Sequence, residues 1–194
     1  MGEDYKGIAI TDRYSADHWL DPEKRQMCWA HLLRDFEAMS MQPGLLGSVG
    51  GLLKLQAEVL LAAHQKVRDG TMTHEEFAKF VESKRELVER LLWTAGQTQT
   101  SKKWSGAARE ILRHVKSLWT CVSDARVSPT SNAAERALRP SVIARKLSYG
   151  SQSERGLRWV ESVQSVRETL RIQSRSFFDF ILAQFQGQHP LLPA

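Results

Sequence analysis

The sequence predicts an α/β fold that is mostly helical, with two short strand-like segments followed by a long region of helical periodicity. The first segment, residues 6–11, is apolar and rich in β-branched residues, as buried strands are. Apolar residues then recur at three- or four-residue steps through much of 52–185, the spacing of one buried helix face. With 194 residues and 42% hydrophobic content, the chain is long enough to bury the core of a full domain.

Two strands are predicted near the N-terminus. Residues 6–11 form the first, so Asp12 is predicted at the C-terminal end of a strand. The turn pair Asp21-Pro22 leads to a second apolar segment, 25–31, which we also predict to be a strand. From Leu32 the apolar spacing becomes helical, and this helix is predicted to end at Pro43-Gly44.

Three helices are predicted in the middle of the chain. The first covers 52–67, and the second begins at Thr73, which forms a capping-box pattern with Glu76. These two are predicted to pack as an antiparallel pair. The third is predicted between Lys102 and Val122.

The C-terminal part is also predicted to be helical. A short helix over 132–139 contains Glu135 and is predicted to end at Pro140. A polar turn over 145–151 then precedes a long helix around 159–170 and a last one around 177–185. The tryptophans that fall among apolar positions are predicted to pack in the interior rather than to stack on bases: Trp29, Trp104, Trp119 and Trp159.

Composition sets limits on the class of protein. Lys and Arg outnumber Asp and Glu by 27 to 22 and the sequence pI is about 9.4, which favours an acidic partner. No uninterrupted apolar run approaches the roughly 18 residues that span a bilayer, and no signal-peptide pattern opens the chain, so we expect a cytoplasmic protein without a membrane partner. Cys28 and Cys121 are too few for a disulfide framework or a four-ligand zinc site, and both are expected to be reduced.

Asp12 and Glu135 are the candidate catalytic and metal-binding residues. Carboxylate oxygens suit Mg²⁺ or Mn²⁺, and two such ions roughly 3.5–4 Å apart can support the displacement of an oxygen from phosphorus. From the residues alone, the favoured interpretation is that Asp12 is a helix N-cap or turn residue and Glu135 is a solvated charge on a helix.

Four ordered blocks of sequence surround these residues: ITDRYSA (10–16), CWAHLLRDF (28–36), PTSNAAERALRP (129–140) and RKLSYGSQSERG (145–156). Together they resemble the insertion sequence sixty-six family of bacterial DDE-type transposases. The resemblance implies that the chain is the C-terminal part of the catalytic region, with a partial RNase H-like core interrupted by a helical insertion. It matches Asp12 to the second acidic residue and Glu135 to the third.

The resemblance also implies a division of the chain and a missing residue. Residues 1–44 are expected to form part of the core, 45–125 the insertion, 126–173 the remainder of the core, and 174–194 a C-terminal helix and tail. The first acidic residue of the family lies in an N-terminal region that these blocks do not include, so we expect a truncated transposase.

Basic residues gather around Glu135 and are the candidate DNA-binding residues: Arg136, Arg139, Arg145, Lys146 and Arg155. They could supply counter-charges to a phosphate backbone at a scissile bond, or they could form an ordinary solvated face with salt bridges. Lys102 and Lys103 are weaker candidates of the same kind.

Cys28 and His31 form a C-x-x-H pair similar to one found after the second acidic residue in several DDE transposase groups. Two ligands do not complete a zinc site, so we favour a structural role near the active centre for Cys28, His31 and Asn132. Ser131 stands where the family usually has Asn.

The predicted function is metal-dependent DNA cleavage and strand transfer, acting on transposon ends and target DNA in the cytoplasm, associated with the nucleoid. The chain alone is expected to be inactive because it supplies two of three carboxylates. Two alternatives are a non-catalytic module that binds DNA, itself or a full-length transposase, and an inert, poorly folded remnant.

Overall fold

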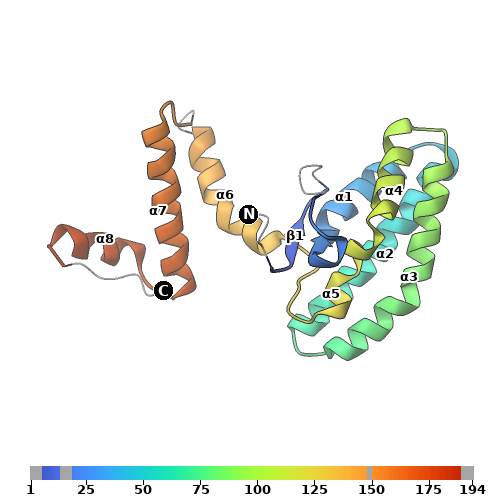
Figure 1. The fold of residues 1–194 in the computed structure, drawn as a ribbon, viewed down its shortest axis with the longest axis horizontal. Coiled ribbons are helices and arrows are strands. Elements are labelled where there is room, and N and C mark those ends of the chain that lie inside the picture. The colour runs from blue at the N-terminus through green and yellow to red at the C-terminus, as the bar shows by residue number, and fades with distance from the viewer. Residues whose placement is uncertain (1–5, 14–18, 148–149, 189–194) are drawn as a thin grey trace. The chain divides into compact units, whose positions relative to one another are not determined.

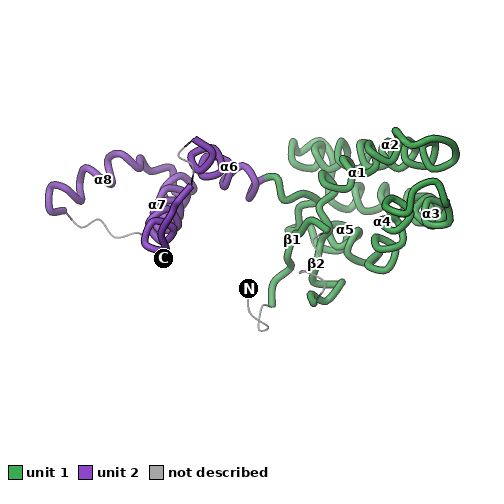
Figure 2. Tube along the Cα trace, turned by 90° about the horizontal axis from the view of Figure 1, so that it is seen from above, with its two compact units in different colours: residues 1–132 green, residues 133–194 purple. Residues whose placement is uncertain are grey.

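The structure is a computed structural model that describes residues 6–13, 19–147 and 150–188 (Figure 1). The described part is mostly helical and divides into two compact units, residues 1–132 and 133–194 (Figure 2). The elements of the first unit are β1 (Ala9–Thr11), η2 (Pro22–Lys24), β2 (Arg25–Met27), α1 (Trp29–Ser40), α2 (Gly44–Arg68), α3 (His74–Gln97), α4 (Lys102–Arg113), η3 (Val115–Leu118) and α5 (Thr120–Ser123). Helix α6 (Asn132–Leu147) begins at the boundary, and α7 (Glu154–Ile172) and α8 (Phe177–Phe185) complete the second unit.

The two predicted strands are present and pair in parallel, with Ala9 opposite Arg25 and Thr11 opposite Met27. The predicted extent of the second strand is wrong, because β2 ends at Met27 and α1 begins at Trp29. Its apolar run continues as the buried face of α1, which includes Trp29, Leu32 and Phe36. A continuous apolar run does not distinguish a buried strand from the first turn of a buried helix.

Helices α1 to α4 form the core of the first unit, each packed against the next along the chain. The predicted pairing of α2 with α3 is confirmed, and Figure 1 shows the two helices side by side. The capping box is also confirmed: Thr73 Oγ1 accepts the N–H of Glu76 at 3.2 Å, and the Glu76 carboxylate accepts the N–H of Thr73 at 2.8 Å.

Helix α2 is the one helix among the described residues that is long and apolar enough, by length and composition, to cross a membrane. Its buried face lies in the core of the first unit and includes Leu46, Leu53 and Leu60. Packing in the core therefore accounts for the apolar residues of this buried face.

The third predicted helix is broken into α4, η3 and α5. The backbone of this region bonds to the strand side of the unit, since the carbonyl of Leu118 accepts from Gln26 Nε2 at 3.1 Å and from Trp29 Nε1 at 3.0 Å. The Ser117 hydroxyl likewise donates to the carbonyl of Pro22 at 3.0 Å. These tertiary hydrogen bonds replace those of a continuous helix.

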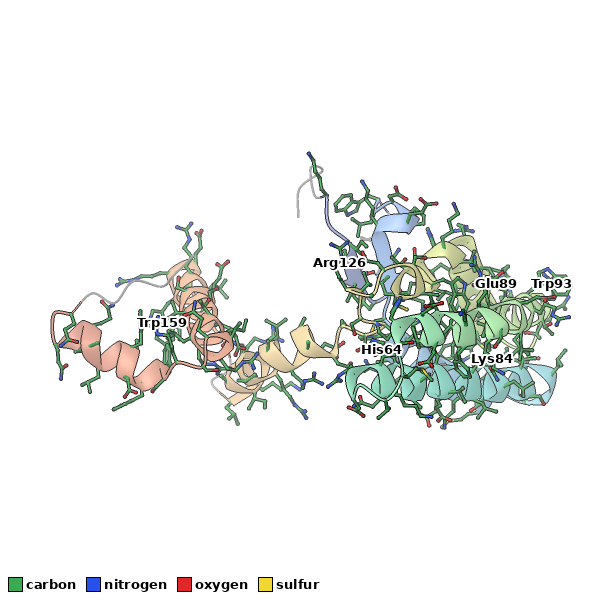
Figure 3. The ribbon with its side chains drawn as sticks, turned by 90° about the horizontal axis from the view of Figure 1, so that it is seen from below. His64, Lys84, Glu89, Trp93, Arg126 and Trp159 are labelled. Carbon is green, nitrogen blue, oxygen red and sulfur yellow. The ribbon has the colours of Figure 1, made fainter. Side chains whose placement is uncertain are left out.

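Two predictions in the second unit are wrong. Helix α6 continues through Pro140 to Leu147 instead of ending at Pro140, so Arg145 and Lys146 are helical. Proline costs the helix one backbone hydrogen bond without always ending it. Trp159 on α7, labelled in Figure 3, is 66% exposed rather than packed inside, whereas Trp29, Trp104 and Trp119 are buried as predicted.

Candidate functional site

Asp12 directly follows β1, as predicted, and is exposed. The backbone on either side of it is held by Arg25, a side chain that is 1% exposed. Arg25 donates from Nη2 to the carbonyl of Asp12 at 2.9 Å and from Nε to the hydroxyl of Thr11 at 2.8 Å. Burying a charged group costs desolvation free energy, which hydrogen bonds such as these compensate. The result is a fixed backbone under the Asp12 carboxylate.

Arg13 fixes the other side of Asp12. Its guanidinium forms an ion pair with Asp35 of α1, at 2.7 Å, and with Glu110 of α4, at 3.2 Å. All three side chains are partly shielded from solvent, which strengthens the pairing relative to an open surface pair. The turn that follows β1 is therefore joined to two helices of the core.

The edge of β2 that does not face β1 is covered by the segment after α4. The Gln26 carboxamide oxygen accepts the N–H of Cys121 at 2.7 Å, and the Thr120 hydroxyl donates to the carbonyl of Arg25 at 2.6 Å. Gln26 is completely buried, so these bonds satisfy polar groups that water does not reach. The strand pair is held in place from this side as well.

Cys28 lies at the junction of β2 and α1 and links two distant segments. Its N–H donates to the carbonyl of Thr11 at 2.8 Å, next to Asp12. Its Sγ atom accepts from both the N–H and the hydroxyl of Ser131, each at 3.3 Å. The N–H of Trp29 adds a 2.8 Å hydrogen bond to the carbonyl of Pro129. The segment that leads into α6 is thereby attached to the strand that carries Asp12.

These contacts agree with a structural role for Cys28. A ring nitrogen of His31 lies within 4.8 Å of Cys28 Sγ, one turn along α1. The Ser131 hydroxyl, at the position where Asn was the expected residue, is used in the bond to Cys28. Both cysteines are free thiols in the structure. Asn132 follows directly as the first residue of α6.

Glu135 lies in the first turn of α6 and is exposed. Arg139 and Lys146 follow at intervals of four and seven residues and so share its face of the helix, with Arg136 and Arg145 on either side. All four cations are exposed, and Arg155 is exposed in the first turn of α7. Asp12 belongs to the first unit and Glu135 with its basic neighbours to the second.

Three residues important for the geometry of Asp12 were not predicted from sequence: Arg13, Arg25 and Gln26. Arg25 and Gln26 carry a usable signal, since they are polar residues within a segment that otherwise has the pattern of a buried strand. Arg13 carries no such signal, because its partners are 22 and 97 residues away.

Comparison with known proteins gives a family match over most of the chain. A family model described as "Transposase IS66 family" matches residues 1–158. An uncharacterized protein, y4qI of Sinorhizobium fredii (strain NBRC 101917 / NGR234), is 27% identical over 191 residues, which cover 91% of this chain and 35% of the relative. The chain thus spans about a third of the length of that relative. No solved structure matches this chain.

Proposed function

Because the chain belongs to the IS66 family of transposases, we propose that it is part of a catalytic region that cuts transposon-end DNA and joins the freed 3′-hydroxyl to target DNA. The observation that supports this most directly is the rigid placement of Asp12, exposed at the end of β1 while Arg13, Arg25 and Cys28 hold its surroundings. A catalytic carboxylate needs such a fixed backbone, whereas an ordinary turn residue does not.

The fold proposed for this region is a partial RNase H-like core with a helical insertion. The parallel pair β1 and β2 would belong to that core within residues 1–44, and the helices of 45–125 would be the insertion. Residues 126–173, with Glu135, would be the remainder of the core, followed by a C-terminal segment over 174–194.

Asp12 and Glu135 are the proposed ligands of Mg²⁺ or Mn²⁺. The donor chemistry fits, because both offer the hard carboxylate oxygens that these ions prefer and both are exposed. When bound, the ions would lower the energy of an attacking and a leaving oxygen at phosphorus. Arg136, Arg139, Arg145, Lys146 and Arg155 would bind the phosphates on either side of the scissile bond and orient the strand.

Metal binding tests the proposed ligands without requiring catalysis. We expect Asp12→Asn and Glu135→Gln each to weaken Mn²⁺ binding, measured by titration calorimetry or electron paramagnetic resonance, by about tenfold or more, as loss of a charged ligand does. Asp69→Asn, at the exposed end of α2, is the matched control and should bind as the unmodified chain does. Equal affinity in all three variants would contradict the assignment.

The 194 residues contain two of the three carboxylates that the family resemblance implies, so we propose that the chain alone does not cleave DNA. Purified protein with Mg²⁺ and transposon-end DNA should give no products above background on a denaturing gel. Efficient cleavage that disappears in Asp12→Ala would show that the chain is active as it stands.

A second candidate function is a non-catalytic module that binds DNA or associates with itself or a full-length transposase. The exposed cations on α6 favour it. DNA binding that is unchanged in Glu135→Ala but reduced at least tenfold in Arg136→Gln/Arg139→Gln, combined with unchanged Mn²⁺ binding in Asp12→Asn, would favour this function over the catalytic one.

A further inference from the structure

We propose that the exposed face of α4 is a second DNA-binding surface, which contacts the phosphate backbone independently of the basic residues on α6. The inference rests on the proposed function only in taking DNA as the partner. The residues concerned, called here the α4 basic face, are Lys102, Lys103, Arg109 and Arg113.

Helix α4 is strongly two-sided. Trp104, Ala108 and Ile111 are buried against the core. Lys102, Arg109 and Arg113 are exposed and separated by seven and four residues, so they lie along one side of the helix. Lys103 is exposed beside them, with its ammonium 4.3 Å from the centre of the Trp104 ring.

Four of the seven Lys and Arg residues on α2 and α3 are neutralised locally. Each has a carboxylate within 4.0 Å on its own helix, at the spacing that stabilises a solvated surface: Lys54 with Glu58, Lys79 with Glu75, Arg85 with Glu89, and Arg90 with Glu86.

The α4 basic face is different. Glu110 is the one carboxylate on α4, and it is paired with Arg13. Among the described residues, no carboxylate lies within salt-bridge distance of the four cations of this face. On α2 and α3, three described cations lack such a carboxylate (Lys66, Arg68 and Lys84), whereas on α4 all four do, so α4 carries the larger share of uncompensated charge.

Arg109 is held in position for binding. Its Nη1 donates to the carbonyl of Gly96 at 2.5 Å, and its Cγ lies so close that a Cβ at Gly96 would be 3.0 Å away. A guanidinium carries five N–H donors in a fixed plane, so one anchored bond leaves others for an anion. Anchoring lowers the entropy that the side chain loses on binding.

The dimensions of the face suit a nucleic-acid strand. At 1.5 Å per residue, Lys102 to Arg113 spans about 16 Å along the helix axis. One strand of B-DNA places a phosphate every 3.4 Å along its axis, so about five phosphates lie within that length. An extended row of cations matches this repeating charge better than it would match a single bound phosphate.

The test compares two triple variants of the full chain that remove equal charge. Lys102→Gln/Lys103→Gln/Arg113→Gln changes the α4 basic face and leaves the packed Arg109 in place. Lys66→Gln/Arg68→Gln/Lys79→Gln removes three exposed cations from α2 and α3. Binding to a random-sequence duplex is measured by fluorescence anisotropy between about 50 and 200 mM salt, the range over which phosphate contacts are resolved.

We expect the α4 variant to lose about tenfold or more in affinity and its log–log salt slope to decrease by about two to three, near 0.9 for each lost phosphate contact. The control should change the slope by less than about one. Lys102→Arg/Lys103→Arg should bind as the unmodified chain does. An unchanged slope in the α4 variant, with a melting curve that shows it folded, would overturn the inference.

The outcomes separate this inference from the proposed function. If Arg136→Gln/Arg139→Gln/Lys146→Gln loses binding while the α4 variant does not, the α4 inference fails and the assignment of α6 stands. If only the α4 variant loses binding, the assignment of α6 fails and the α4 inference stands. If the unmodified chain binds poly-glutamate but no duplex at low salt, the face serves an acidic protein and the inference is wrong.

Discussion

Cys28 shows how one small buried side chain can join segments that are remote in sequence. Its sulfur accepts two hydrogen bonds from Ser131, 103 residues away, while its N–H binds the backbone next to Asp12. Sulfur is a weak acceptor, but two donors converge on it in a site where the thiol is 1% exposed. Removing the sulfur would leave the Ser131 donors without this partner.

Cys28→Ala is expected to lower the free energy of unfolding by about 1–3 kcal/mol, through the loss of the two hydrogen bonds from Ser131 and the small cavity. Chemical unfolding in urea measures it. Ser131→Ala is the second variant of the pair. If the two residues interact, the double variant should lose less unfolding free energy than the sum of the losses in the two single variants. Strict additivity would contradict the link.

His64 is expected to make the first unit sensitive to mild acid. Burial against the core lowers its pKa from the ordinary 6.5, with smaller contributions from Arg68 and His74, and its ring lies edge-on to Phe77 at 5.6 Å. A histidine whose folded pKa is lowered binds fewer protons in the folded state than in the unfolded one. The stability it supports is complete above the unfolded pKa of 6.5 and is lost as the pH falls through the lower folded value.

The melting temperature of the chain should therefore fall between pH 7 and pH 5. His64→Gln should flatten this part of the profile, whereas a variant of an exposed group, Lys79→Gln, should leave it unchanged. A profile with the same slope in His64→Gln would assign the acid sensitivity to other groups. Differential scanning fluorimetry across the pH range is sufficient.

At the scale of elements, α1 and α2 approach so closely that two positions in α2 require glycine. A Cβ at Gly47 would lie 2.0 Å from the carbonyl oxygen of Gln42, and one at Gly50 would lie 2.5 Å from the backbone nitrogen of Ser40. Both contacts are with backbone, which cannot move aside as a flexible side chain can. The end of α1 and the turn after it can therefore lie against α2 only because these two positions of α2 have no side chain.

Gly50→Ala is expected to destabilise the protein by about 1–3 kcal/mol, because the two helices must separate to admit the methyl group. Gly51→Ala is the matched control one residue along the same helix. A methyl group added at Gly51 would have no neighbouring atom within 4 Å, so this variant should stabilise by about 0.5–1 kcal/mol through helix propensity. Destabilisation of equal size at both positions would show that the close approach of the two helices at Gly50 does not explain the loss.

Elements whose signal is local could be predicted from the sequence, and elements set by distant partners could not. The capping box at Thr73 and Glu76 and the period of α3 depend on neighbours within a few residues, and both were predicted. The breaks after Arg113 depend on hydrogen bonds from Gln26 and Trp29, about 90 residues earlier. Whether α6 ends at Pro140 or continues through it depends on a small energy difference, and the local rule that proline ends a helix predicts the wrong outcome here.

The same distinction applies to the candidate site. A strand ending at Asp12 could be predicted, since β-branched apolar residues precede it. Its supports could not, because Arg13 pairs with Asp35 and Glu110 across the fold. The roles of Asp12 and Glu135 as metal ligands stay predictions, which the Mn²⁺ titration tests.

At the scale of the whole molecule, the two units differ in how they bury apolar side chains. The described core cluster of the first unit lies entirely between Met27 and Trp119 and includes large buried side chains from four helices. In the second unit, Leu170 is the one buried apolar residue among those described, and Leu147, Ile172 and Phe185 are each at least 75% exposed. The first unit therefore contains what independent folding requires.

A chain ending at Asn132 is expected to unfold in one cooperative transition by circular dichroism, because its core needs no residue from 133–194. A chain of residues 133–194 should show helical dichroism with a broad, weakly cooperative melt and should bind a dye specific for exposed apolar surface. A broad melt for residues 1–132 would show that the second unit is required for the first to fold.

The two buried cysteines allow opening of the first unit to be followed by the rate of thiol alkylation. Cys28 and Cys121 are the only thiols in the sequence, both lie in the first unit, and each is 1% exposed. Burial raises the pKa of Cys121 to about 12, so the nucleophilic thiolate is scarce while the unit is closed. Alkylation must await a local or global opening, and its rate then measures how often the first unit exposes its interior.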